Sequence, residues 1–416
     1  MNASRFVYTL LLYALLPRAL AHLWWRARRQ PAYTEHIGER FGRYAAPARA
    51  PLIWVHAVSV GETRAAAPLI RELQRRYPGH RVLLTHMTPT GRDTGHALFG
   101  DGVERCYLPY DFPFAVARFL AHYQPVCGIL LETEIWPNLI HACHVRKIPI
   151  YLANARMSEK SRRRYARFPA FAAACLNELT DIAAQSRADA DRLQSLGALA
   201  VAVTGNLKFD ITPDPVLVAL GTRWRTDWGR ARPVLLCAST RAGEEELLLA
   251  AMQRLDVRDL LVLIVPRHPQ RFDAVAVLIE QAGIAYQRRS AGKPVAATTR
   301  IVLGDSMGEM FAYYAASDVA IIGGSLLPYG AQNPIEACAA GCPVIVGSHT
   351  YNFAEVVQLA VDAGAAVRVD DAPAAVIAAR ELLLDPPRAQ QVGAAGVAFT
   401  REHRGAAQRI ADLVKF

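Results

Sequence analysis

The sequence lacks the features on which several classes of protein depend. Its cysteines number seven, an odd count, and lie in apolar stretches such as 125–129, so they do not form a disulfide framework and indicate a reducing compartment. No zinc-finger spacing, RNA-binding aromatic signature or long Lys/Arg tail occurs, which argues against nucleic acid as a partner. His141, Cys143 and His144 are close in sequence but have no matching second pair, so we predict that they are structural and bind no metal.

The composition indicates a large protein with a substantial core and a basic surface. Of the 416 residues, 52% are hydrophobic and 20% are charged, so the chain is not disordered and exceeds what one hydrophobic core usually supports. We therefore expect two domains. The formal net charge of +10 favours anionic partners, such as acidic lipid or a phosphorylated substrate.

The N-terminus has the pattern of a membrane anchor. Residues 6–16 are almost wholly apolar, and after a Pro-Arg step residues 19–25 are apolar again. This length is marginal for a spanning helix, so the segment could span the membrane or lie in its interface. Only Arg5 precedes the segment, whereas several arginines follow it, which places the downstream chain in the cytoplasm and predicts an uncleaved anchor at 1–30. The arginines that follow are Arg26, Arg28 and Arg29.

The rest of the chain alternates between strand and helix patterns, which is typical of parallel, doubly wound sheets. In the first half, the predicted strands are 52–57, 81–85, 128–131, 148–153, 181–184 and 200–203, and the predicted helices are 63–77, 91–98, 113–123, 136–146 and 188–196. In the second half, the predicted strands are 233–238, 260–265, 301–303, 319–322, 343–346 and 366–369, and the predicted helices are 244–253, 270–282, 308–315, 334–340 and 352–363.

Two prolines within Asp210–Pro215 interrupt both patterns and mark the expected hinge between the halves. We predict an α/β fold with two parallel-sheet lobes, 48–210 and 211–416, whose last helix could pack back on the first lobe. Two such lobes would face a cleft and bind ligands at the carboxyl ends of their strands.

Acidic and basic residues follow predicted strands of the first lobe. Glu62 comes after an apolar strand and Gly61, where it could act as a catalytic base or complement the dipole of the helix that follows. Glu132 and Glu134 follow another strand. Lys208 follows the last strand, where it could neutralise the negative charge of a leaving group or remain a solvated charge.

Three loops of the second lobe could bind an anionic or nucleotide ligand. Arg267, between two prolines, offers a rigid guanidinium to a phosphate or carboxylate. Residues 304–309 could present backbone N–H groups at a helix N-terminus, although they match neither the Walker nor the dinucleotide fingerprint. In the third loop Asn333 is a good N-cap, Pro334 a good first helical residue, and Glu336 could cap the helix or bind ribose hydroxyls.

Together and in this order, these segments resemble the lipid IVA 3-deoxy-D-manno-octulosonic acid (Kdo) transferase family of Gram-negative bacteria. The segments that carry the resemblance are the N-terminal anchor, His56–Glu62, Glu132–Asn138, Thr204–Asp210, Pro266–Pro269, Gly304–Glu309 and Gly323–Glu336. The resemblance implies a GT-B fold of two Rossmann-like lobes. It also implies that CMP-Kdo is the donor and lipid IVA the acceptor, with neither metal nor cofactor, at the cytoplasmic face of the inner membrane.

The resemblance also implies roles for individual residues. Glu62 matches the catalytic base of an inverting transfer, and Glu132 and Lys208 match residues assigned to stabilising the transition state. The residues that match CMP-binding segments are Arg267, His268, Met307, Gly308, Glu309, Asn333, Pro334, Ile335 and Glu336. A basic stretch could meet acceptor phosphates or anionic headgroups of the inner membrane, or form a solvated helical face. It contains Arg156, Lys160, Arg162, Arg163 and Arg164.

Two other functions compete with this prediction. A GT-B transferase that uses a UDP-sugar would share the fold, although the second lobe lacks an obvious cluster for a diphosphate. A membrane scaffold that retained a nucleotide-binding fold would share the anchor, but it has no use for a base such as Glu62 at a strand end.

Overall fold

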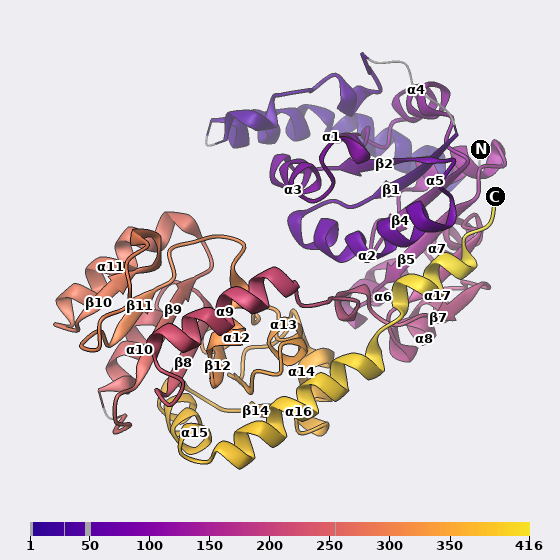
Figure 1. The fold of residues 1–416 in the computed structure, drawn as a ribbon. Helices are drawn as coiled ribbons and strands as arrows, with labels where there is room; N and C mark the ends of the chain where they lie inside the picture. Colours follow the sequence, from indigo (N-terminus) through magenta and orange to yellow (C-terminus); the bar gives the residue numbers. More distant parts are fainter. Residues whose placement is uncertain (1–2, 29, 46–50, 254) are drawn as a thin grey trace. The chain divides into compact units, whose positions relative to one another are not determined.

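Two seven-stranded sheets, in which every strand pairs parallel to its neighbours, organise the chain in the computed structural model (Figure 1). The structure describes residues 3–28, 30–45, 51–253 and 255–416, so Arg29 and the predicted linker residue Pro47 lie outside the described part. The chain divides into unit 1, residues 1–210 with 404–416, and unit 2, residues 211–403. The segment after His403 thus belongs with the first sheet.

Unit 1 contains the first sheet, whose strand order is β3-β2-β1-β4-β5-β6-β7. Apolar runs form its central strands because helices cover both faces and bury alternate side chains equally. Gly128 is required within β4, since a Cβ there would lie 2.6 Å from the Trp54 ring. The strands are β1 (Leu52–His56), β2 (Arg81–His86), β3 (Glu104–Tyr107), β4 (Cys127–Leu131), β5 (Ile150–Ala155), β6 (Asp181–Ala184) and β7 (Val201–Val203).

The helices of unit 1 pack on both faces of this sheet and bury one apolar cluster on each. The C-terminal helix α17 (Ala406–Leu413) packs against α2 on one face. The other α-helices are α1 (Ala3–Ala27), α2 (Val60–Arg76), α3 (Pro89–Phe99), α4 (Pro113–Tyr123), α5 (Pro137–Val145), α6 (Glu159–Tyr165), α7 (Pro169–Asn177) and α8 (Arg187–Ser195). Short 3₁₀ turns are η1 (Pro31–Tyr33), η2 (Glu39–Phe41), η3 (Gly100–Gly102) and η4 (Leu207–Phe209).

Unit 2 contains the second sheet, in the order β10-β11-β9-β8-β12-β13-β14. Its strands are β8 (Val234–Thr240), β9 (Leu261–Pro266), β10 (Tyr286–Arg288), β11 (Ile301–Leu303), β12 (Val319–Ile322), β13 (Val344–Val346) and β14 (Ala366–Arg368). Its helices are α9 (Pro215–Trp228), α10 (Glu244–Met252), α11 (Phe272–Gln281), α12 (Met310–Ala316), α13 (Ile335–Ala339), α14 (Ala354–Asp362), α15 (Ala372–Leu384) and α16 (Pro386–His403), with 3₁₀ turns η5 (Pro269–Arg271) and η6 (Arg289–Ala291).

The predicted α/β class of two parallel-sheet lobes is confirmed, but the sequence missed some elements. It missed β3 and β10, which are short edge strands with polar residues and therefore lack the apolar pattern of a central strand. It also missed α9, because Pro215 was taken as part of a break. Pro215 instead begins that helix, and the Asp214 side chain accepts a hydrogen bond from the Val216 N–H at 2.8 Å.

Each sheet has a topological switch point between two neighbouring strands. The chain connections that follow these two strands lead to opposite edges of the sheet. In unit 1, β1 lies between β2 and β4, so the carboxyl ends of β1 and β4 flank the switch point. In unit 2, β8 lies between β9 and β12 and creates the same arrangement. Ligands of open α/β sheets bind at such points. The loops after these strands are therefore the first places to look for a site.

The N-terminal helix α1 is docked on unit 1 through polar side chains. Arg5, which is 3% exposed, donates to the Glu178 carboxylate at 2.7 Å. The Tyr8 hydroxyl donates to Asp111 at 3.0 Å. Within the described part of the chain, this is the one helix long and apolar enough to cross a membrane, and only 11% of its apolar window is buried.

Candidate active site

Glu62 lies in the first turn of α2, directly beyond the carboxyl end of β1. The helix begins at Val60, three residues earlier than predicted, with Ser59 as its N-cap. The Val58 N–H donates to Glu62 Oε2 at 2.7 Å, and the Ser59 hydroxyl lies 3.4 Å from Oε1. Glu62 therefore ties down the turn that enters the helix, in addition to the contact with the helix dipole considered from the sequence.

The pKa of the Glu62 carboxyl group is suited to a general base. Burial is the largest cause that raises its pKa, to about 7, and the nearby carboxylates Glu132 and Glu134 raise it further, while the Val58 N–H lowers it. No ion pair to Glu62 occurs among the described residues. A carboxylate that titrates near neutral pH can accept a proton and release it again, so the hydrogen bond to the turn does not prevent the predicted role as a base.

Glu132 follows β4 on the other side of the switch point and has a strained backbone. Its φ of 57° lies in the left-handed region, which is uncommon for a residue other than glycine and costs of order 1 kcal/mol or more. Lys208 Nζ lies 3.4 Å from Glu132 Oε1, and both side chains are mostly buried. The structure thus brings together Glu62, Glu132 and Lys208, as their predicted shared role requires.

Amide side chains at the ends of the neighbouring strands hold Lys208 in place. Asn154, at the end of β5, accepts a hydrogen bond from the Leu207 N–H at 3.0 Å. Asn206 accepts from the Lys208 N–H at 3.0 Å and donates to Gln185 at 3.0 Å. These bonds fix the turn η4 and therefore the position of the lysine opposite Glu132.

His56 also lies at the carboxyl edge of the first sheet, and we did not predict it as a site residue from the sequence. It is fully buried at the end of β1, and its Nε2 lies 3.7 Å from Glu134 Oε2. The Trp136 indole N–H donates to the same Glu134 oxygen at 2.8 Å. A histidine at the end of an otherwise apolar strand was the signal for this contact, but its partner follows a different strand.

In unit 2, arginines gather around His268 where β8 and β9 end. Burial is the largest cause that lowers the pKa of His268, and the charges of Arg241, Arg267 and Arg271 lower it further. Arg267 Nε donates to Gln332 Oε1 at 3.1 Å, and the Arg241 guanidinium lies 4.6 Å from the centre of the Tyr329 ring. Such a cluster of cations suits a phosphate ligand.

Glu244 organises the glycine loop after β12 and was also missed from the sequence. It is fully buried, and its carboxylate accepts hydrogen bonds from the N–H groups of Gly324 at 2.6 Å and Leu326 at 3.0 Å. Glycine is required in this loop because a Cβ at Gly323 would lie 2.4 Å from the Ser239 carbonyl oxygen. The bonds place the loop beside the carboxyl end of β8, at the switch point.

The other predicted nucleotide-binding residues lie in two loops of unit 2. Glu309 is the N-cap of α12, and the Arg289 guanidinium donates to it at 2.9 Å. Gly308 has a φ of 84°, and nothing lies within 4 Å of where a Cβ would stand. Met307 is 53% exposed. Backbone and an exposed side chain are thus available to a ligand here, whereas the Glu309 carboxylate already has a partner.

In the loop before α13, the predicted helix start is one residue too early, because Pro334 is the N-cap and Ile335 the first helical residue. The Asn333 side chain accepts a hydrogen bond from the Ile335 N–H at 3.1 Å. Its amide nitrogen lies 3.4 Å from Glu336 Oε1. Pro334 and Ile335 are buried, so only their backbone atoms can face a ligand. Asn333 and Glu336 therefore offer the polar side chains of this segment.

Comparison with known proteins identifies the family. Residues 35–211 match the family described as 3-deoxy-D-manno-octulosonic-acid transferase, and residues 247–398 match glycosyl transferases group 1. The chain is 45% identical to a 3-deoxy-D-manno-octulosonic acid transferase of Bordetella pertussis, over 99% of both chains. It belongs to the Kdo transferase family.

Further similarities of this Kdo transferase agree with that assignment. A 3-deoxy-D-manno-octulosonic acid transferase of Haemophilus influenzae is 39% identical, over 99% of this chain and 98% of the relative. Among solved structures, a UDP-GlcNAc 2-epimerase from Neisseria meningitidis bound to UDP-GlcNAc matches with a TM-score of 0.60 at 15% identity, over 87% of this chain and 99% of the epimerase. That likeness shows the GT-B-like fold alone. The sequence relatives and the family match show that this Kdo transferase is a glycosyltransferase.

The basic stretch of this Kdo transferase is partly neutralised by its own helix. Glu159 at the start of α6 accepts hydrogen bonds from Arg162 at 2.8 Å and from Arg163 at 2.9 Å. Arg162 and Arg163 therefore fit the second alternative considered from the sequence, a solvated helical face. The predicted structural role of His141 fits its contact with Glu178 Oε1, which lies 2.9 Å from His141 Nδ1.

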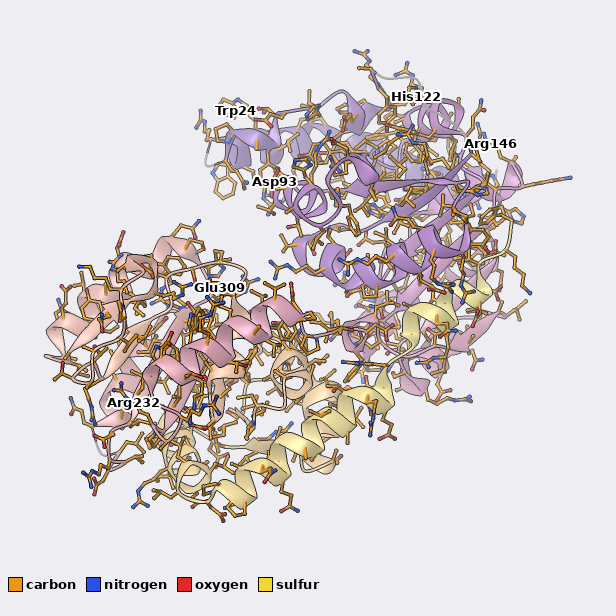
Figure 2. All side chains as sticks on the ribbon, in the orientation of Figure 1. Trp24, Asp93, His122, Arg146, Arg232 and Glu309 are labelled. Carbon is orange, nitrogen blue, oxygen red and sulfur yellow. The ribbon has the colours of Figure 1, made fainter. Side chains whose placement is uncertain are left out.

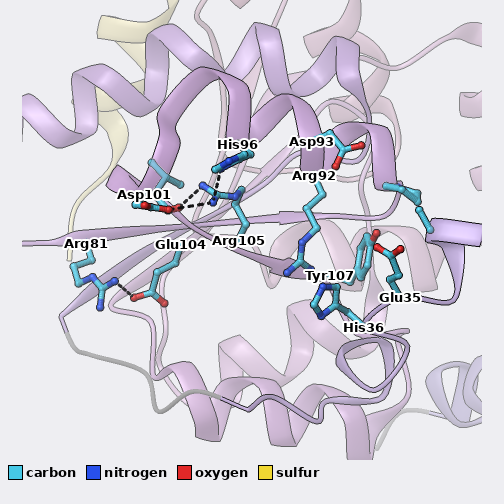
Figure 3. Close-up of a pocket in the computed structure, with 13 residues that line it drawn as sticks. Glu35, His36, Arg81, Arg92, Asp93, His96, Asp101, Glu104, Arg105 and Tyr107 are labelled. Atoms are coloured by element: carbon cyan, nitrogen blue, oxygen red, sulfur yellow. Dashed lines mark hydrogen bonds and ion pairs between the residues drawn. The ribbon is translucent and has the colours of Figure 1, made fainter.

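A hollow of about 510 Å³ in the Kdo transferase lies along the outer edge of β3, away from the carboxylates after β1 and β4 (Figure 3). Part of its charged lining is paired within the hollow. Arg81 forms an ion pair with Glu104, and Arg105 donates to His96 Nδ1 at 3.0 Å and lies 3.9 Å from Asp101. Because the hollow lies at the edge of the sheet and not at the switch point, we do not assign the reaction to it.

Proposed function

We propose that this Kdo transferase moves Kdo from CMP-Kdo to lipid IVA with inversion at the anomeric carbon. In this proposal Glu62 removes the proton from the attacking hydroxyl of the acceptor. The observation that carries the proposal is a partly buried carboxyl group at a switch point, with a pKa of about 7 and no ion pair among the described residues. One base is sufficient for direct displacement, which inverts the reacting carbon.

Each unit, taken by itself, carries charge that suits one of the two groups separated when the donor bond breaks. As the bond from the anomeric carbon to the CMP oxygen lengthens, positive charge develops on the sugar and negative charge on the phosphate. Glu132, held by Lys208, supplies negative charge for the sugar. Arg241 and Arg267 supply positive charge for the phosphate, whereas Arg271 already donates to the buried Glu245 carboxylate at 2.7 Å. CMP carries a single phosphate, which these side chains can neutralise.

The direct test is mass spectrometry of lipid IVA after incubation with CMP-Kdo and the protein. A product heavier by one or more Kdo residues supports the proposal, and the mass also counts the sugars added. An unchanged lipid would contradict it. Inhibition by CMP but not by UDP is expected, whereas inhibition by UDP alone would favour a UDP-sugar transferase of the same fold.

We further propose that α1 attaches the protein to the cytoplasmic face of the inner membrane by lying in the interface. The start of the helix is tied to unit 1 through Arg5 and Tyr8, and the chain after its end returns to η2, whose Arg40 is 2% exposed. With both ends held by the same unit, the helix presents an apolar side to lipid rather than crossing it. Exposed side chains on it are Phe6, Val7, Leu10, Leu11, Leu15, Leu20, Trp24 and Trp25, of which Trp24 is labelled in Figure 2.

Negative charge placed on the exposed apolar side of α1 tests whether this helix attaches the protein to the membrane. The substitutions Leu11→Glu and Leu15→Glu change side chains that are 56% and 55% exposed, so they should not disturb packing within unit 1. We expect the double variant to move from the membrane fraction to the soluble fraction after lysis. Continued tight membrane association would contradict the role of α1. The control pair Arg223→Glu and Arg230→Glu, on unit 2, should leave the fractionation unchanged.

A further inference from the structure

An apolar pocket of about 160 Å³ lies in unit 1 between α1, the loop that leads into α5, and helices α6 to α8. Side chains from all these elements line it, and none of them carries a formal charge. They include Tyr8, Ile135, Tyr165, Ala172, Cys175 and Leu196. We infer that this pocket holds the end of one acyl chain of the lipid acceptor. The inference rests on the proposed function, because it requires an acceptor that carries acyl chains.

The chemistry of the lining favours hydrocarbon. The Tyr8 hydroxyl turns out of the lining to donate to Asp111 at 3.0 Å, while its ring stands 6.0 Å from the Phe171 ring. Burial raises the pKa of the Cys175 thiol to about 12, so it stays a neutral, weakly polar group. A polar ligand would lose its hydration without gaining partners here, whereas an acyl chain loses only unfavourable contact with water.

The pocket lies one loop away from the reacting edge. Ile135 belongs to the loop that begins with Glu132 at the end of β4. On the opposite wall, Tyr165 is close enough to Glu134 for that carboxylate, after burial, to raise the pKa of its phenol. A lipid whose sugar stands at Glu62 and Glu132 would therefore have hydrocarbon within reach of the pocket.

The helix α1 that contributes Tyr8 to the pocket also carries exposed apolar side chains. Tyr8 lines the pocket, and Leu11 and Leu15 lie three and seven residues after it, spacings that keep side chains on one side of a helix. Both leucines are more than half exposed. An acyl chain that lies along this side of α1 would therefore meet apolar side chains on its way to the pocket.

Filling the pocket from α7 tests the inference. Ala172→Leu adds three carbons at a buried lining position, and Ala170→Leu, at an exposed position on the same helix, is the matched control. Transfer is measured with lipid IVA in detergent micelles and with the fully deacylated disaccharide bisphosphate. We expect Ala172→Leu to raise KM for lipid IVA about tenfold, since roughly two methylene groups lose their place, and to leave kcat unchanged. The deacylated acceptor and the control should behave as with the unchanged protein.

Each other outcome has a distinct meaning. An unchanged KM for lipid IVA, or an equal loss with both acceptors, would overturn the acyl site, as would a change in membrane partition alone, which would indicate a bulk phospholipid. Should Ala172→Leu fail to fold, as judged by thermal unfolding, Cys175→Leu fills the same pocket from the next turn of α7 and carries the same expectation. If the unchanged protein transfers nothing to either acceptor, the proposed function fails instead, independently of the pocket.

Discussion

The two units share a sheet pattern but present opposite charges at their switch points. In unit 1, Glu62, Glu132 and Glu134 follow β1 and β4, and the charges of Glu132 and Glu134 raise the pKa of Glu62. In unit 2, the carboxylates after β8 are Glu244 and Glu245, and both are fully buried. The same backbone arrangement therefore supports an acidic site in one unit and a cationic site in the other, because function depends on the loops grafted on it.

The difference lies in how many donors each carboxylate receives. Glu62 accepts one short hydrogen bond from a backbone N–H and a longer one from Ser59. Glu244 accepts from the N–H groups of Arg241, Gly324 and Leu326. A carboxylate surrounded by backbone donors is fixed as part of the scaffold, whereas one with fewer donors and carboxylate neighbours remains able to exchange a proton.

The largest effect is expected from removing the base of unit 1. Glu62→Gln keeps the shape of the side chain and can still accept from Val58, but it cannot take up a proton. We expect the transfer rate to fall by about 10³-fold, within the range for general base catalysis, with CMP binding unchanged. Steady-state kinetics and calorimetry measure the two quantities.

The control for this variant lies on the same helix. Glu72→Gln removes a carboxylate near the end of α2 that pairs with Arg75 and Arg76, far along the helix from the switch point. It should leave the transfer rate unaltered. Near-normal turnover of Glu62→Gln would remove the base assignment and with it the functional contrast between the units.

The next largest effect should come from the scaffold carboxylate of unit 2. Glu244→Ala leaves the N–H groups of Gly324 and Leu326 buried without acceptors. We expect the free energy of unfolding to fall by about 3 kcal/mol or more and CMP binding to weaken. Glu246→Ala, at an exposed position on the same helix, is the control for denaturant unfolding. Equal stability of the two variants would show that the glycine loop does not depend on Glu244.

The sequence was sufficient to predict the central strands and the position of Glu62. Central strands are buried on both faces, so they appear as apolar runs such as Leu52–His56 whatever the rest of the chain does. Because the carboxyl ends of parallel strands lie at one edge of the sheet, a residue that follows such an apolar run is predicted to lie at that edge. The pattern failed for the edge strand β3, whose residues Glu104 and Arg105 are polar.

Contacts between distant segments could not be predicted. The first turn of α10 contains three glutamates, and nothing in the local sequence distinguishes Glu244, which the fold brings to Gly324, 80 residues later. In the same way, His56 and Glu134 follow different strands, and their approach depends on the pairing of β1 with β4. Local patterns specify elements, whereas these contacts depend on topology.

A smaller effect is expected from the arginines of unit 2. Arg267→Ala removes one charge from the cluster around His268. We expect the dissociation constant of CMP to rise about 10- to 100-fold, as for the loss of a charged hydrogen bond. Arg258→Ala, whose side chain is 96% exposed, is the control in the same calorimetric titration. Unchanged affinity of Arg267→Ala would mean that the phosphate binds elsewhere.

The pH dependence of transfer further tests the contrast between the carboxylates of the two units. Since the pKa of Glu62 is raised to about 7, the fraction of ionised base grows tenfold per pH unit below that value and levels off above it. We expect kcat/KM for the acceptor to follow this curve. An acceptor profile that is flat between pH 5.5 and 8, measured with saturating donor, would contradict Glu62 as the titrating base.

The smallest expected effect is a gain in stability when the base is removed. The folded pKa of Glu62, about 7, exceeds its ordinary value of 4.5, so the folded protein holds the proton more tightly and loses stability as the pH rises between these values. Glu62→Gln abolishes that loss. At pH 8 the variant should therefore be more stable than the unchanged protein by about 1 kcal/mol, a value reduced by the partial exposure of the side chain. At pH 4 the two should be equal in denaturant unfolding. A variant that is less stable at both pH values would show that capping the turn outweighs burying the charge.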